Sequence, residues 1–161
     1  MNRRLNKMLN AVTASLLSML GFSACSNSSG GDEPCLYGSP TTDYHFKGTV
    51  TDEQGAPIKG IKVVSQMKHG DVTYRLDSTY TDSNGAYQTA DQHSASTVDY
   101  FLKNKQLSVS FEDVDGEDNG GEFETAKTES DDVGVKQIEK GDGVWYKGKY
   151  ELTADKKLKK K

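Results

Sequence analysis

Cysteine, proline and tryptophan are scarce in this sequence of 161 residues, which has two cysteines, three prolines and one tryptophan. Two cysteines cannot build the dense disulfide framework that stabilises many small exported domains. The chain beyond residue 24 also lacks a sustained helical period of apolar residues, which argues against a helical bundle. Glycine and tyrosine are plentiful, at 16 and 8 residues, and this composition suits a small domain of strands and turns rather than disorder.

Positive charge is scarce in the body of the chain as well. The formal net charge is −4, and the first 24 residues contain Arg3, Arg4 and Lys7 but no acid, so the remainder is more acidic still. General nucleic-acid binding needs a basic face, and an acidic body argues against it. Lysine dominates residues 156–161, and such a tail is expected to be a solvated, frayed end.

The first 24 residues have the order of a secretory signal. A basic segment at Met1–Lys7 precedes a mainly apolar one at Met8–Leu20, and the small residues Ser23 and Ala24 come directly before Cys25. The apolar run is short and rich in Ser, Thr and Asn, whereas a membrane span needs roughly 20 apolar residues. An ordinary signal peptide with an incidental cysteine and a short membrane anchor are the alternatives.

The position of Cys25 resembles the lipobox of bacterial lipoproteins. The resemblance implies cleavage before Cys25 and a lipid on its sulfur that holds the chain on a membrane. Residues 26–31 form a flexible linker by composition, and Ser26 in place of Asp is similar to lipoproteins sent to an outer membrane. We expect a signal peptide at 1–24, a lipidated tether at 25–42 and one folded domain at 43–161, in the bacterial cell envelope.

The folded part is predicted to consist of short strands. In the segment 43–52, Tyr44, Phe46 and Val50 share one face, with His45 and Lys47 on the other, as in a half-buried strand. Similar alternation predicts further strands at 61–64, 72–80, 86–89, 107–111, 123–128, 133–135 and 144–152.

Turn signals separate these strands. Asn84-Gly85 favours a turn with positive φ, and residues 91–105 are expected to hold a loop or a helical turn. About seven short strands with regular turns predict an all-β fold, a single antiparallel β-sandwich.

Two segments of the sequence resemble a known type of domain. Gly48–Val63 looks like the start of carboxypeptidase-regulatory-like and other prealbumin-like domains, and Thr81–Tyr87 is similar to their second hallmark. The resemblance implies a prealbumin-like sandwich. It indicates little about function, because such domains serve as spacers, docking modules and stabilisers.

A narrower resemblance covers nearly the whole chain. Cys35–Pro40, residues 113–121 and Trp145–Gly148 resemble lipoproteins associated with radical S-adenosylmethionine (radical SAM) enzymes in Bacteroides-like bacteria. This implies that the protein is a partner or a substrate of such an enzyme, and it makes Cys35 and Tyr37 the candidates for modification. A small buried hydrophobe or an intermolecular disulfide are the alternatives for Cys35.

Oxygen-bearing side chains gather between residues 113 and 119. Calcium takes about six to eight oxygen ligands, so this loop is a candidate calcium site, although its spacing is not that of an EF-hand. The alternative is a solvated acidic turn whose side chains cap backbone groups. The candidate ligands are Asp113, Asp115, Glu117, Asp118 and Asn119.

No pair of nucleophile and base can be recognised, and the three histidines, at 45, 69 and 93, are isolated and expected at the surface. The Tyr-Arg-Gly-Ser ending of prealbumin-like hydroxyisourate hydrolases is absent, and nothing suggests the two-Tyr, two-His iron site of intradiol dioxygenases. The sequence thus predicts an envelope lipoprotein that is not an enzyme and presents its sandwich for interaction. The alternatives are a calcium- or ligand-binding surface module that also uses the Trp145-Tyr146 edge and, third, an envelope hydrolase with Asp77 or Glu112 as acid or base.

Overall fold

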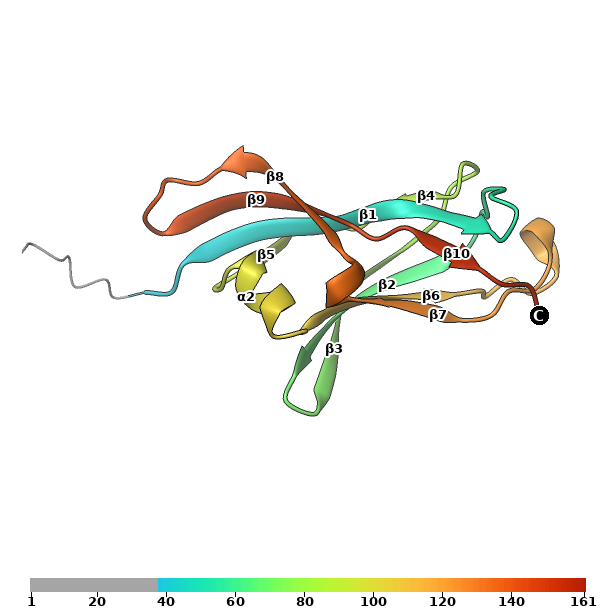
Figure 1. Ribbon diagram of the computed structural model, residues 1–161, viewed down its shortest axis with the longest axis horizontal. Helices are drawn as coiled ribbons and strands as arrows, with labels where there is room; N and C mark the ends of the chain where they lie inside the picture. Colours follow the sequence, from blue (N-terminus) through green and yellow to red (C-terminus); the bar gives the residue numbers. More distant parts are fainter. Residues whose placement is uncertain (1–37) are drawn as a thin grey trace, which may run out of the picture. The chain divides into compact units, whose positions relative to one another are not determined.

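The computed structural model describes residues 38–161, so the predicted signal peptide, most of the predicted tether and the candidate residues Cys25, Cys35 and Tyr37 lie outside the described residues. The described part forms ten strands in two sheets, with one short α-helix (Figure 1). None of the helices within 38–161 has the length and apolar character needed to cross a membrane.

The first sheet is centred on its longest strand, β1 (Thr41–Asp52). Parallel to it run β9 (Tyr146–Thr153) and β10 (Lys156–Leu158), which pair with successive parts of β1, and antiparallel to it run β4 (Ala86–Gln88) and β5 (Gln92–Ser94). The outer strand β8 (Gly134–Lys140) pairs antiparallel with β9 alone.

The second sheet is antiparallel throughout, in the order β3-β2-β6-β7. Its strands are β2 (Lys62–His69), β3 (Val72–Tyr80), β6 (Leu107–Glu112) and β7 (Ala126–Glu129). Gly70, with φ of 60°, makes the tight turn between β2 and β3, and the tip of this hairpin projects away from the other strands (Figure 1). The helix α2 (Val98–Lys103) follows β5 and is capped by Thr97, whose hydroxyl accepts a hydrogen bond from the backbone of Tyr100.

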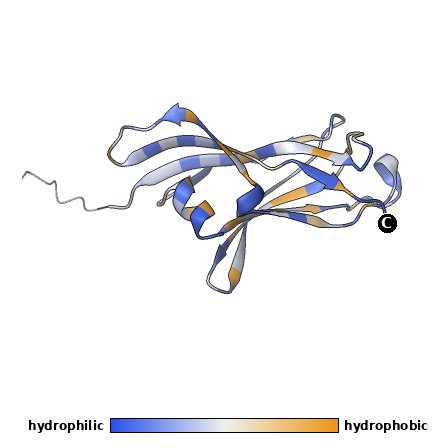
Figure 2. Ribbon diagram, in the orientation of Figure 1, coloured by the Kyte–Doolittle hydropathy of each residue, from blue (hydrophilic) through white to orange (hydrophobic). Residues whose placement is uncertain are grey.

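One hydrophobic core joins the two sheets. Phe46 and Leu152 come from the first sheet, Val63 and Phe111 come from the second, and α2 adds Phe101. Apolar and polar residues alternate along the strands, as the colours in Figure 2 show, because successive side chains point to opposite faces. Burial of this apolar surface is the main force that holds the described part together.

Two turns beside β1 have the same construction. The Asp52 carboxylate accepts hydrogen bonds from the backbone N–H groups two and four residues later, at 2.9 and 2.8 Å, and Asp82 does the same at 2.8 and 2.9 Å. The second turn is tied to β1, since the backbone N–H of Val50 donates to the carbonyl of Gly85 at 2.8 Å. The Asn84-Gly85 turn expected from sequence is confirmed, with Gly85 at φ of 69°.

Three details of the expected fold are wrong. There are ten strands rather than about seven, and the first sheet is mixed, because β9 and β10 run parallel to β1. Parallel neighbours need a long crossover connection, here everything from β2 to β8, which short-range alternation cannot predict. The lysine-rich end is no frayed tail, because Leu158 is buried in the core and its strand pairs with β1.

Candidate functional site

In the candidate calcium loop, the carboxylate of Asp113 is bound to nearby backbone N–H groups. Asp113 accepts hydrogen bonds from the N–H groups of Asp115, at 3.2 Å, and of Phe123, at 2.8 Å. Burial raises the pKa of the Asp113 carboxyl, but these hydrogen bonds outweigh it, and the net pKa lies below the usual value. The loop geometry therefore matches the capping turn that was the alternative to a calcium site.

The other candidate ligands do not converge on one point. The side chain of Asn119 donates to the Asp115 carboxylate, while Glu117 and Asp118 are exposed. Within 38–161 no group of three or more His, Cys, Asp or Glu side chains is arranged to hold a metal ion. Calcium binding by this loop stays a prediction.

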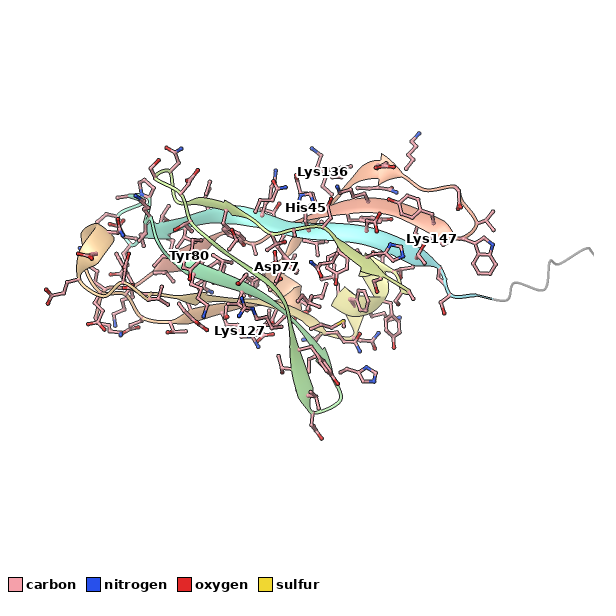
Figure 3. All side chains as sticks on the ribbon, turned by 180° about the vertical axis from the view of Figure 1, so that it is seen from behind. His45, Asp77, Tyr80, Lys127, Lys136 and Lys147 are labelled. Carbon is pink, nitrogen blue, oxygen red and sulfur yellow. The ribbon has the colours of Figure 1, made fainter. Side chains whose placement is uncertain are left out.

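A network of charged and polar side chains covers the outer face of β1, opposite the core. His45 Nδ1 lies 3.0 Å from Asp91 Oδ1, and Lys149 Nζ donates to the other oxygen of Asp91 at 2.5 Å. Lys47 and Glu151 form an ion pair at 2.9 Å beside them. Figure 3 shows His45 on β1, with Lys136 on β8 at the outer part of the same sheet.

The network continues toward the start of β1. Asp43 accepts a hydrogen bond from the Tyr146 hydroxyl at 3.1 Å, and its other oxygen lies 2.6 Å from His93 Nδ1. Burial first, and then the Asp43 carboxylate, raise the pKa of Tyr146 to about 12. Tyr146 thus belongs to this polar network, whereas the ring of Trp145 packs against Gly38, where an added Cβ would lie 2.9 Å from the ring.

The expectation of a surface position is wrong for one histidine. His45 has only 5% of its surface exposed, while His69 and His93 are exposed as expected. Alternation along β1 places His45 on the outer face correctly, but the segment leading into β5 covers it with Asp91. The alternation pattern of one strand cannot predict that Asp91, 46 residues later in the chain, covers His45.

Ion pairing fixes the charge state of this network. Hydrogen bonding to Lys149 lowers the pKa of Asp91, and hydrogen bonding to Lys47 lowers the pKa of Glu151. Both carboxylates therefore stay ionised at neutral pH, each already bound to a lysine. These ion pairs and hydrogen bonds hold the side chains of the network in place on the outer face of β1.

The strand β8 has a different surface. All seven of its residues are exposed, including the apolar side chains Val135 and Ile138, and among residues 38–161 β9 is its sole partner strand. A bulge between Gln137 and Glu139 interrupts its pairing with β9. The outer edge of β8 therefore offers unpaired backbone groups to solvent.

No family model and no curated protein matches the chain. Among solved structures it is similar to 3-chlorocatechol 1,2-dioxygenase from Rhodococcus opacus (15% identity, TM-score 0.46, 80% of this chain and 62% of that one). It is also similar to catechol 1,2-dioxygenase from Pseudomonas arvilla (14%, 0.44, 97% and 69%) and hydroxyquinol 1,2-dioxygenase from Pseudomonas putida (12%, 0.43, 91% and 71%).

These neighbours correct one expectation. The sequence predicts a protein that is not an enzyme, yet the solved structures named above are dioxygenases, so that prediction is overturned. The chain spans 62% of the length of the first of them. At these identities and TM-scores the likeness carries over no reaction, substrate or metal to this chain.

Proposed function

We propose that this chain is an envelope lipoprotein, held by lipid on Cys25, whose body is a prealbumin-like β-sandwich that docks a partner protein. The partner in this proposal is a radical SAM enzyme, for which the lipoprotein serves as partner or substrate. The lipobox-like signal and the resemblance of the segments around Cys35 and Trp145 support it. The outer membrane is the proposed location.

The paired turns support the prealbumin-like part of the proposal. The two segments that resemble such domains contain Asp52 and Asp82, and their turns share one hydrogen-bonding pattern on neighbouring parts of the fold. Two sheets with a common core give the layers that a sandwich requires.

The observation that carries the docking role is the free edge of β8. An extended segment of a partner can add to such an edge as a new strand, through backbone hydrogen bonds. The strand β8 carries Lys136 and Lys140 against one acid, Glu139. Lys147 follows on the adjacent strand β9, and Figure 3 labels it together with Lys136. An extended partner segment that carries acidic side chains fits this edge best, because opposite charges across an interface steer and align the partner.

The docking role is tested by co-purification of the tagged full-length protein with the radical SAM enzyme from membranes of the native host. Replacing both Val135 and Ile138 with glutamate should abolish co-purification, because the two added negative charges repel an acidic segment and the apolar contacts are lost. The control is Val114→Glu, which changes a similarly exposed valine outside β8. Absence of the enzyme with the unchanged protein, or its equal loss with the control, would disprove the proposal.

The anchoring is tested by the intact mass of the mature protein from the same membranes. We expect the mass of residues 25–161 plus a lipid on Cys25, and a further gain or loss at Cys35 or Tyr37 if the protein is a substrate rather than a partner. A mature chain that begins elsewhere, or one that carries no lipid, would contradict the anchoring.

A further inference from the structure

An open groove lies where the β2–β3 hairpin meets α2, in segments distant in sequence from β8. We call it the hairpin groove. Its volume is about 430 Å³, and the side chains that the argument uses are Met67, His69, Tyr74, Tyr100, Phe101 and Gln106. The sequence pattern predicted neither the groove nor these residues as a site, because they come from three separate segments.

The groove has a rigid floor. Phe101 is buried in the core, and its ring lies 6.1 Å from that of Tyr44 on one side and 6.1 Å from that of Tyr100 on the other. Backbone bonds tie the two walls together, since Gln106 donates to the carbonyl of Phe101 at 2.8 Å and accepts from Lys68 at 2.7 Å. A surface held in place in this way loses little entropy when a ligand binds.

The lining is aromatic but carries no permanent charge. Tyr74 and Tyr100 are each about half exposed, at 50% and 51%, and both face the groove with rings that could bury further area. Ser94, Ser96 and Gln106 add uncharged donors and acceptors, and within the described part of the chain no Asp, Glu, Lys or Arg lines the groove. Charged residues make up 27% of the chain, so an uncharged lining differs from the rest of the surface. Such a lining disfavours an ionic ligand, because a buried charge needs a charged partner.

We infer that the hairpin groove binds a neutral oligosaccharide. A sugar ring has one apolar C–H face, which can lie against an aromatic ring, and a rim of hydroxyl groups, which the serine, glutamine and histidine side chains can meet. The groove is open rather than enclosed, so a chain of sugar units can enter along it while its outer hydroxyls stay in water.

A peptide strand fits this groove less well. Met67 and Tyr74 are opposite each other in the β2–β3 ladder, so the groove wall is the face of a hairpin whose backbone groups are already paired there. A peptide bound against this face could not add to the ladder, so it would lack the backbone hydrogen bonds that hold an extended peptide at a sheet edge. The inference does not depend on the β8 edge or on the lipid.

The test is calorimetric titration of the full-length protein with hexaoses of glucose, xylose, mannose and N-acetylglucosamine. We expect at least one to bind. Tyr74→Ala and Tyr100→Ala should each raise Kd by about tenfold, because each removes one stacking surface. Tyr80→Ala is the matched control, since Tyr80 is 57% exposed but lies outside the groove, and it should leave Kd unchanged.

Four results would overturn the inference. They are no binding of any of the four hexaoses, binding that survives both groove substitutions, binding that Tyr80→Ala weakens equally, and a dimer in sedimentation that Tyr74→Ala dissolves. Thermal unfolding of each variant shows that the exposed substitutions leave the fold intact. Failure of the β8 co-purification would not affect this result, so the two proposals fail separately.

Discussion

The strands β1 and β8 belong to one sheet but have opposite environments. Phe46 and Val50 of β1 are completely buried and the strand pairs with four others, whereas every residue of β8 is exposed and it pairs with β9 alone. The two strands therefore differ both in the number of partner strands and in burial. Because burial of apolar surface is the main stabilising force, β1 is expected to contribute more to stability, and the side chains of β8 are exposed to other contacts.

The largest contrast is expected from truncation of the two strands. Phe46→Ala should lower the free energy of unfolding by about 3–5 kcal/mol, because it removes a fully buried ring and leaves a cavity. Ile138→Ala in β8 should change it by less than about 0.5 kcal/mol. Urea unfolding of both variants makes the comparison. A loss at Ile138 that approaches the loss at Phe46 would show that β8 is covered in solution.

Alkaline pH should lower the stability of the protein through Tyr44 in β1. The strand β8 should make no such contribution, since it contains no tyrosine. Burial raises the pKa of Tyr44 from its ordinary value of 10.0 to about 12, so the folded protein keeps this proton while the unfolded chain loses it. Stability is therefore complete below pH 10 and falls by roughly 2–3 kcal/mol as the pH rises toward 12.

Tyr44→Phe tests this cause, because it has no proton to lose. Urea titrations at pH 9 and above should show a smaller alkaline loss in this variant. Some loss should remain, because burial and the nearby Asp155 also raise the pKa of Tyr87. An identical alkaline loss in Tyr44→Phe would rule out Tyr44 as a source.

Two glycines, Gly48 in β1 and Gly134 in β8, compare the packing around the two strands at the level of one added methyl group. A Cβ added at Gly48 in β1 would lie 2.4 Å from the carbonyl oxygen of Ala154 and 3.0 Å from the ring of Tyr87, so Gly48→Ala should cost about 1–3 kcal/mol. At Gly134 in β8 the nearest atom is 3.5 Å away, and Gly134→Ala should be neutral or stabilise by up to about 1 kcal/mol. Thermal unfolding measures both, and equal losses would contradict the packing seen around Gly48.

A smaller loss than that at Phe46 is expected in the loop at 113–119. Asp113→Asn should lower the free energy of unfolding by about 1 kcal/mol, because a charged acceptor of two backbone hydrogen bonds becomes a neutral one. The loss should be the same with calcium and with a chelator. A melting temperature of the unchanged protein that rises with calcium, and does not rise in Asp113→Asn, would establish the calcium site instead.

Local patterns in the sequence predict much of the fold. The alternation around Tyr44 and Phe46 predicts β1, that of Val109 and Phe111 predicts β6, and the expected helical turn is α2. The sequence does not predict β10, because lysines next to Leu158 look like a solvated tail until β1 is placed beside them. The hairpin groove and the cover over His45 were missed for the same reason, since both join segments that are distant in sequence.

The pairing of β1 with β9 and β10 has a consequence for the order in which the protein assembles. Thr49 and Asp155, 106 positions apart, are joined by a hydrogen bond of 2.7 Å between the N–H of one and the carboxylate of the other. Synthesis on the ribosome delivers β1 early and its parallel neighbours last, so the nascent chain carries an incomplete sheet until nearly all of the body has emerged. Pairing between segments so far apart in the sequence is slow, so completion of the first sheet around β1 is expected to be a late step in folding.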